Sequence, residues 1–208
     1  MTRYDFIAGF YDFLLGKVEN NILSPIREKY VHRIEGKILD IAVGTGNNIA
    51  FYPTKSKVVL VDKSERMLEL ARKKASQRED LNLTFVCSSL EDLPFENESF
   101  DMILSIDVFC SVKDPQKVVS ELFRVLKNNG EGIFIEHGKV DSKMKNTLLY
   151  LTNAITYPTV GSSMTRTPLK YIKESDFKIL EIENLKGTFK FIFVKKQSGQ
   201  QVMPRKSF

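Results

Sequence analysis

The sequence of 208 residues predicts an α/β fold, in which a mostly parallel sheet carries helices on both of its faces. Two observations lead to this prediction. Short apolar runs rich in β-branched residues alternate with amphipathic helical stretches through the middle of the chain, and crossovers between parallel strands need such helices. The composition, 42% hydrophobic and 27% charged, is ordinary for a globular chain that buries a sizeable core.

Five apolar runs predict the parallel strands, at residues 37–43, 57–62, 82–87, 100–106 and 130–136. Amphipathic periodicity between them predicts helices at residues 64–77 and 115–127. Ser64 and Asp114 are typical N-cap residues, and Pro115 suits the first position of a helix. This alternation of strand and helix is what places helices on both faces of one sheet.

The two ends of the chain follow a different pattern. Residues 4–28 and 142–157 are predicted to be helical, and residues 158–167 to form a loop. Residues 176–183 and 188–196 are predicted strands that a short turn at Lys186-Gly187 joins, which indicates antiparallel pairing.

The net charge of +5 is concentrated at one end of the chain. Residues 184–208 contain six basic residues and no acidic one, so the remainder is nearly neutral and the whole protein is not a polyanion binder. The basic end is either a solvated strand edge with a frayed tail or a contact for phosphates on lipid or nucleic acid. The two cysteines form no CxxC pair and there are only two histidines, so we expect no metal site. No apolar leader follows Met1, which favours a cytoplasmic location.

A glycine-rich turn follows the first predicted strand. Gly44 and Gly46 let backbone amides approach a ligand closely, as a dinucleotide or S-adenosylmethionine requires. The dinucleotide fingerprint has a third glycine where this chain has Ile49. Asp40 would repel a pyrophosphate but suits the ammonium group of a methionine moiety. Asp62, which ends the second strand, can accept hydrogen bonds from the ribose of either ligand.

Four segments resemble the motifs of the class I S-adenosylmethionine-dependent methyltransferases, in the same order and at similar spacing. They are ILDIAVGTGNN, VVLVDKSERMLELARKKA, VCSSLEDLPFENESFDMILS and SELFRVLKNNGEGIFIE, within residues 38–136. The resemblance implies a three-layer, doubly wound sheet of seven strands, mostly parallel with an antiparallel last strand, together with N-terminal lid helices. It also implies S-adenosylmethionine as the cofactor.

We therefore expect a single methyltransferase domain over residues 1–208. Its expected parts are lid helices at 1–35, a cofactor-binding core at 36–137, a substrate-cap region with the C-terminal strand pair at 138–196, and a basic tail at 197–208.

The resemblance also implies roles for individual residues at the cofactor. The methionine part would be lined by Gly44, Thr45 and Gly46, with Asp40 behind them. Asp62 would hold the ribose. The adenine and the sulfonium would be contacted by Lys63, Met67, Leu90 and Ser105.

Two positions depart from the family pattern. Ala42 stands where the family usually has glycine, which narrows the floor of the expected pocket. Ser89 stands where an aspartate usually accepts a hydrogen bond from the adenine amino group, and its hydroxyl is a weaker acceptor.

His137, directly after the fifth strand, is the best-placed general base if the methyl acceptor must lose a proton. The competing interpretation is a structural histidine at the end of the strand. Tyr11 resembles a family tyrosine in a lid helix over the cofactor, and it equally suits ordinary aromatic packing.

The acceptor is less well specified by the sequence. Residues 106–109 lack the prolines found at this point in methyltransferases that act on nucleobase amines. The pattern resembles the branch of ubiquinone/menaquinone C-methyltransferases and phosphatidylethanolamine N-methyltransferases, and it is also similar to the alkyl-thiol methyltransferases of animals. A small-molecule or lipid-like acceptor (an amine, a quinol carbon or a thiol) follows from this resemblance, with peripheral contact at a membrane as a further expectation. The alternative is a protein that binds S-adenosylmethionine without catalysis.

Overall fold

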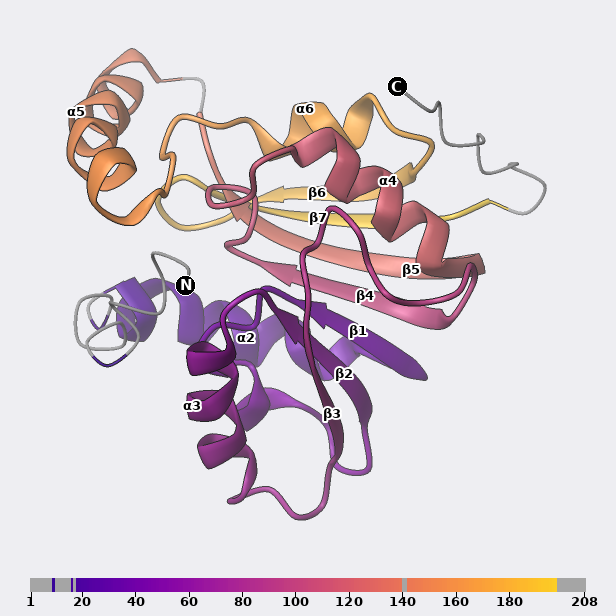
Figure 1. Ribbon diagram of the computed structural model, residues 1–208. Coiled ribbons are helices and arrows are strands. Elements are labelled where there is room, and N and C mark those ends of the chain that lie inside the picture. The colour runs from indigo at the N-terminus through magenta and orange to yellow at the C-terminus, as the bar shows by residue number, and fades with distance from the viewer. Residues whose placement is uncertain (1–8, 10–15, 17, 140–141, 198–208) are drawn as a thin grey trace.

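The computed structural model describes residues 18–139 and 142–197, together with Gly9 and Gly16. Seven strands form one sheet in the order β3-β2-β1-β4-β5-β7-β6 (Figure 1). Neighbours from β3 to β5 pair in parallel, whereas β7 is antiparallel to both β5 and β6. The predicted seven-stranded, mostly parallel sheet with an antiparallel last strand is therefore confirmed.

The strand bounds follow the predicted apolar runs closely. They are β1 Lys37–Ile41, β2 Lys57–Asp62, β3 Asn82–Cys87, β4 Phe100–Ile106, β5 Leu126–His137, β6 Lys178–Asn184 and β7 Phe189–Lys195. The central strands β1 and β4 are buried along almost their whole length. Such continuous burial is typical of strands that helices cover on both faces.

Helices cover both faces of the sheet. The helical segments are η1 Glu19–Leu23, α2 Ser24–Tyr30, η2 Val31–Arg33, η3 Ile49–Phe51, α3 Glu65–Ala75, α4 Pro115–Val125, α5 Lys143–Val160 and α6 Pro168–Lys173. One apolar core lies between the sheet and helices α4 and α6, and a second lies between the sheet and helices α2 and α3. Helix α5 stands apart from both layers, beyond the ends of the central strands (Figure 1).

The predicted N-caps are confirmed. The hydroxyl of Ser64 accepts a hydrogen bond from the Met67 amide at 3.2 Å, and Oδ1 of Asp114 accepts one from the Lys117 amide at 3.1 Å. Each cap satisfies one of the free amides of the first helical turn. The two helices therefore begin where the sequence predicts.

Two predicted boundaries are wrong. Helix α4 ends at Val125 rather than residue 127, because Leu126 pairs with Phe100 and opens β5 four residues early. Helix α5 continues through Pro158, where the sequence predicts a loop. Gly161 ends it instead: its φ is +78°, and its amide donates to the carbonyls of the last turn.

One residue of the predicted basic end is not at the surface. Lys196 is fully buried, and its ammonium group donates to the carbonyls of Phe123 (3.0 Å) and Leu126 (2.8 Å) at the end of helix α4. It thus satisfies carbonyls that have no partner within the helix. Residues 198–208, most of the predicted basic tail, lie outside the described residues.

Candidate active site

The turn after β1 has a strongly left-handed backbone. Ala42, Gly44 and Gly46 have φ angles of +47°, +55° and +82°. A Cβ added to Gly44 would meet no atom within 4 Å, whereas one added to Gly46 would lie 2.7 Å from Cδ1 of Ile49. Gly46 is therefore required by packing, and Gly44 leaves open space at the turn.

Asp62 is held in a fixed orientation at the end of β2. Its two carboxylate oxygens accept hydrogen bonds from the amides of Gly44 and Ser64, both at 2.9 Å. Burial raises the pKa of Asp62, and the two amides oppose that rise. Each oxygen keeps a further lone pair, so the carboxylate can accept hydroxyl donors from a ligand.

Asp40 is sealed behind the turn rather than at its mouth. Its carboxylate is fully buried and accepts hydrogen bonds from the Asn48 amide group, at 2.8 Å, and from the Tyr52 hydroxyl. Burial raises the pKa of Asp40 to about 6. Its position behind the glycines is the one that the family resemblance implies, and Asp40 does not line the cavity.

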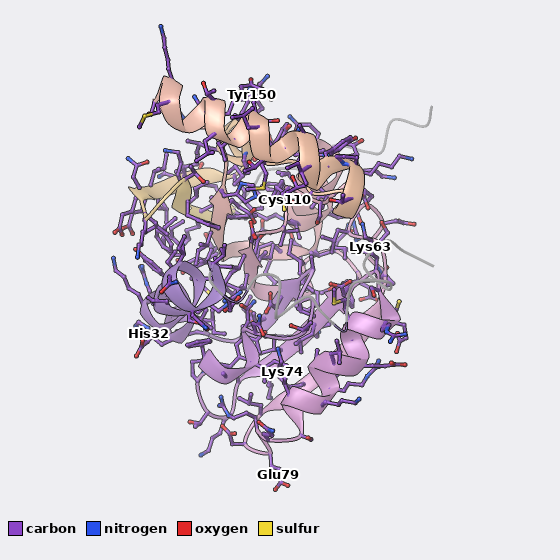
Figure 2. All side chains as sticks on the ribbon, turned by 90° about the vertical axis from the view of Figure 1, so that its left-hand side faces the viewer. His32, Lys63, Lys74, Glu79, Cys110 and Tyr150 are labelled. Atoms are coloured by element: carbon purple, nitrogen blue, oxygen red, sulfur yellow. The ribbon has the colours of Figure 1, made fainter. Side chains whose placement is uncertain are left out.

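The main cavity has a volume of about 540 Å³ and opens beside this turn. That volume is within the range of pockets that enclose small-molecule ligands. Six residues that the sequence assigns to the cofactor line one end of it: Ala42, Gly44, Asp62, Lys63, Met67 and Leu90. Figure 2 shows Lys63 near the end of helix α3 and Cys110 beneath helix α5.

Four other residues assigned to the cofactor do not line the cavity. Thr45 is buried against the ammonium group of Lys74, 3.1 Å away, and Gly46 packs against Ile49 and Ala71. Ser89 donates its hydroxyl hydrogen bond to the Glu91 carboxylate, and it is Glu91 that lines the cavity. Ser105 is fully buried and holds Glu136 instead.

The opposite end of the cavity contains His137 and Asp107. Nε2 of His137 lies 3.3 Å from Oδ1 of Asp107, and the histidine side chain is 4% exposed. The ligand atoms of Asp107, His137 and Cys110 lie within 4.8 Å of one another. Burial raises the pKa of the Cys110 thiol well above its usual value, so this sulfur is a neutral part of the wall.

A buried glutamate fixes the backbone that carries Asp107. The carboxylate of Glu136 accepts hydrogen bonds from Ser105 Oγ at 2.7 Å, Val108 N at 3.0 Å and Phe109 N at 3.1 Å. Burial raises its pKa to about 8, and the nearby negative charge of Asp107 adds to that rise. The family resemblance implied that Ser105 lies near the sulfonium. In the structure its hydroxyl donates to the Glu136 carboxylate instead.

Several wall residues were not predicted. Asp107 has a φ of +60°, a left-handed conformation that aspartate tolerates better than most residues. Its position after a central parallel strand is a signal that could have identified it, because ligands bind at the carboxyl ends of such strands. The threonines 152, 156 and 159 of helix α5, which lie inside the predicted substrate-cap region, line the cavity as well. Tyr11 lies outside the described residues.

The sheet order, the left-handed glycine turn and the acid at the end of β2 together define the class I methyltransferase type of fold. The residues at this end of the cavity also fit the cofactor of that class. Gly44 leaves open space where a backbone must approach a ligand, and Asp62 presents an oriented, buried carboxylate.

The family itself is shown by comparison with known proteins. A model of the methyltransferase domain matches residues 39–134. The ubiquinone/menaquinone biosynthesis C-methyltransferase of Rickettsia felis is 30% identical over 187 residues, which cover 83% of this chain and 72% of that protein. This chain belongs to the class I S-adenosylmethionine-dependent methyltransferases, in the branch that contains the quinone C-methyltransferases and the phosphatidylethanolamine N-methyltransferases.

Two further relatives lie in the same branch. The mitochondrial 2-methoxy-6-polyprenyl-1,4-benzoquinol methylase of Caenorhabditis elegans is 30% identical over 183 residues, 81% of this chain. The phosphatidylethanolamine N-methyltransferase of Cereibacter sphaeroides is 33% identical over 133 residues, 61% of this chain. The matched regions cover 63% of each of these two relatives.

A solved structure shows the same fold at low sequence identity. The S-adenosylmethionine-dependent methyltransferase of Thermotoga maritima, titled a possible histamine N-methyltransferase, superposes with a TM-score of 0.69 at 20% identity. The superposition covers 94% of this chain and 98% of that one. In the part of the chain that the structure describes, no helix combines the length and the apolar character needed to cross a bilayer.

Proposed function

We propose that this protein transfers the methyl group of S-adenosylmethionine to a small-molecule or lipid-like acceptor: an amine, a quinol carbon or a thiol. One observation carries the proposal. A single cavity joins a cofactor end, at Gly44 and Asp62, to a second end where His137 faces the carboxylate of Asp107. A site that only bound the cofactor would not need an ionisable pair at the far end.

At the cofactor end, we assign binding roles to the six predicted residues that line the cavity. Asp62 holds the ribose, Gly44 admits the backbone side of the methionine part, and Met67 and Leu90 flank the base. Thr45, Gly46 and Asp40 support the turn from behind. When bound, S-adenosylmethionine supplies a methyl group activated by its positive sulfur.

At the acceptor end, His137 would take the acceptor proton, while bound S-adenosylmethionine would supply the methyl group. The Asp107 carboxylate, 3.3 Å from Nε2, orients the imidazole for this proton transfer. It also stabilises the imidazolium that results. His137 then returns the proton to solvent after the product leaves.

The walls at this end favour an acceptor with an apolar body. Phe189, whose ring packs against His137, lines the cavity, as do Met164, Val112 and the threonines of helix α5. Apolar walls exclude water from the reacting atoms, and the few polar groups orient the acceptor. A quinol, a long-chain amine and a long-chain thiol all fit that description, and a nucleic acid does not. A cytoplasmic location stays a prediction from the sequence.

The test is methyl transfer from labelled S-adenosylmethionine to a panel that contains an alkyl thiol, a polyprenyl quinol and phosphatidylethanolamine. We expect transfer to at least one of them, and His137→Gln should lower kcat by about a hundredfold or more. Binding of S-adenosylhomocysteine, measured by calorimetry, should be unchanged in that variant. His32→Gln is the matched control, because His32 is exposed and lies outside the cavity.

Two outcomes would contradict the proposal. Tight binding of S-adenosylhomocysteine with no transfer to any acceptor would favour the non-catalytic alternative. Full activity of the His137→Gln variant at every pH would remove the histidine from the reaction and leave only cofactor binding and acceptor positioning to the protein.

A further inference from the structure

Exposed apolar side chains gather on helix α5. Six of the nine large hydrophobic side chains that are exposed in the described part of the chain belong to it: Met144, Leu148, Tyr150, Leu151, Ile155 and Tyr157. Met144 is 81% exposed and Ile155 is 68% exposed, whereas Leu180 and Ile182 on β6 are below one half. Figure 2 shows Tyr150 on α5 at the outer edge of the molecule.

Four of these residues form a continuous stripe. Met144, Leu148, Leu151 and Ile155 are spaced by four, three and four positions, which places them on one face of a helix. We call these four residues the α5 stripe. Thr152 and Thr156 each follow a stripe residue by one position, so they lie on the adjoining face, and that face lines the cavity. Helix α5 thus separates the cavity from an exposed apolar surface.

The charges at the start of helix α5 are mostly positive. Residues 139–160 contain three lysines and a single acidic residue, Asp141. Lys143 begins helix α5 and is exposed. The ammonium group of Lys139 lies 4.9 Å from the ring centroid of Tyr150. Basic groups beside tyrosines and long aliphatic side chains match the boundary between lipid headgroups and acyl chains.

We propose that the α5 stripe docks on the surface of a membrane that contains anionic lipids. The stripe residues enter the boundary of the acyl chains, and Lys139 and Lys143 at the start of the helix meet the headgroup phosphates. A second copy of the chain is a poorer occupant, because it would bring an equally positive surface against this one. Docking in this orientation places the α5 wall of the cavity beside the lipid. An acceptor with a long apolar tail can then pass from the membrane into the cavity, a consequence that rests on the proposed function.

The docking is tested without cofactor or acceptor, so its failure would leave the proposed methyl transfer untouched. The full chain is mixed with vesicles of phosphatidylcholine, or of phosphatidylcholine with phosphatidylglycerol, and the bound fraction is measured by flotation. We expect binding to the anionic vesicles only, weakened by added salt. The double variant Leu148→Gln, Leu151→Gln should bind at least about tenfold more weakly, because two stripe residues no longer leave water.

Substitutions on β6 serve as matched controls for the apolar and for the electrostatic contribution to binding. Leu180→Gln with Ile182→Gln removes exposed apolar surface from β6, and it should leave binding within about twofold of wild type. Lys143→Gln should weaken binding to anionic vesicles, whereas Lys178→Gln, an exposed position on β6, should not. Thermal melting and S-adenosylhomocysteine binding establish that each variant is folded.

Equal losses in the α5 and β6 variants would overturn the proposal, as would wild-type protein that ignores anionic vesicles. Light scattering, which measures the oligomeric state, tests whether a second copy of the chain binds the stripe. A dimer that the Leu148→Gln, Leu151→Gln variant abolishes, with no vesicle binding by the wild type, would assign the stripe to a second copy of the chain instead.

Discussion

Nε2 of His137 lies 3.3 Å from Oδ1 of Asp107, although thirty positions separate the two residues in the chain. The parallel register of β4 with β5 causes this approach, because it pairs Ile106 with Ile135 and so brings the ends of both strands together. Glu136 then holds the backbone amides of residues 108 and 109. The relationship makes Asp107 a positioning residue for the proposed base.

Asp107→Asn should keep the fold, because asparagine also tolerates the left-handed backbone at this position. The amide cannot stabilise a protonated imidazole, so kcat should fall by about ten- to a hundredfold. The affinity for S-adenosylhomocysteine should not change. The loss should shrink for an aromatic thiol that is already ionised at the assay pH, and an equal loss for ionised and protonated acceptors would contradict the assigned role.

Asp62→Ala should weaken the binding of S-adenosylhomocysteine by about 1.5–3 kcal/mol, because charge-assisted hydrogen bonds to the ribose are lost. Isothermal titration calorimetry measures the change. Asp80→Ala serves as the control, since Asp80 forms an exposed pair with Arg78 and does not line the cavity. An unchanged affinity in the Asp62 variant would mean that the cofactor binds elsewhere.

Glu136 should make the stability of the protein depend on pH. Burial raises its pKa from 4.5 to about 8, so the folded state holds this proton more tightly than the unfolded state does. The free energy of unfolding should therefore fall as the pH rises between these two values. Glu136→Gln should flatten that fall, as measured by urea unfolding across the same pH range, whereas Glu79→Gln, at an exposed position, should not.

The two glycines of the turn should respond differently to the same substitution. Gly46→Ala places a Cβ 2.7 Å from Cδ1 of Ile49 and 2.9 Å from Cβ of Ala71, so it should cost about 2–5 kcal/mol of stability. Gly44→Ala meets no atom within 4 Å and should cost only the backbone term, about 1–2 kcal/mol. Urea unfolding of both variants provides the comparison, and equal costs would show that the packing around Gly46 is looser than described.

Ala42→Gly should stabilise the protein. Ala42 has a φ of +47°, a left-handed conformation that is strained for alanine and not for glycine. The free energy of unfolding should therefore rise by about 0.5–1 kcal/mol in the variant. Ala154→Gly, in the middle of the exposed helix α5, should lower it by a similar amount. Comparing these two variants distinguishes the effect of glycine at a left-handed position from its effect in an ordinary helix. A loss of stability in the Ala42 variant would mean that its methyl group packs well enough to outweigh the strain.

The sequence alone determined what local spacing controls. Runs of alternating or continuous apolar residues predicted all seven strands, Ser64 and Asp114 predicted the starts of two helices, and the spacing of Gly44, Gly46 and Asp62 predicted the turn and the acid that now line one end of the cavity. These features depend on neighbours within a few residues, so a single sequence contains them.

Only the tertiary structure decided which side chains reach the cavity. Asp40 and Ser105 lie on buried strands beside the site, yet each is turned to a partner of its own: Asn48 and Tyr52 enclose one, and Glu136 accepts from the other. The meeting of Asp107 with His137 depends on the register between two strands, and the two faces of helix α5 depend on where that helix packs. Contacts between segments far apart in the chain are set by the packing of the whole domain, and no local pattern specifies them.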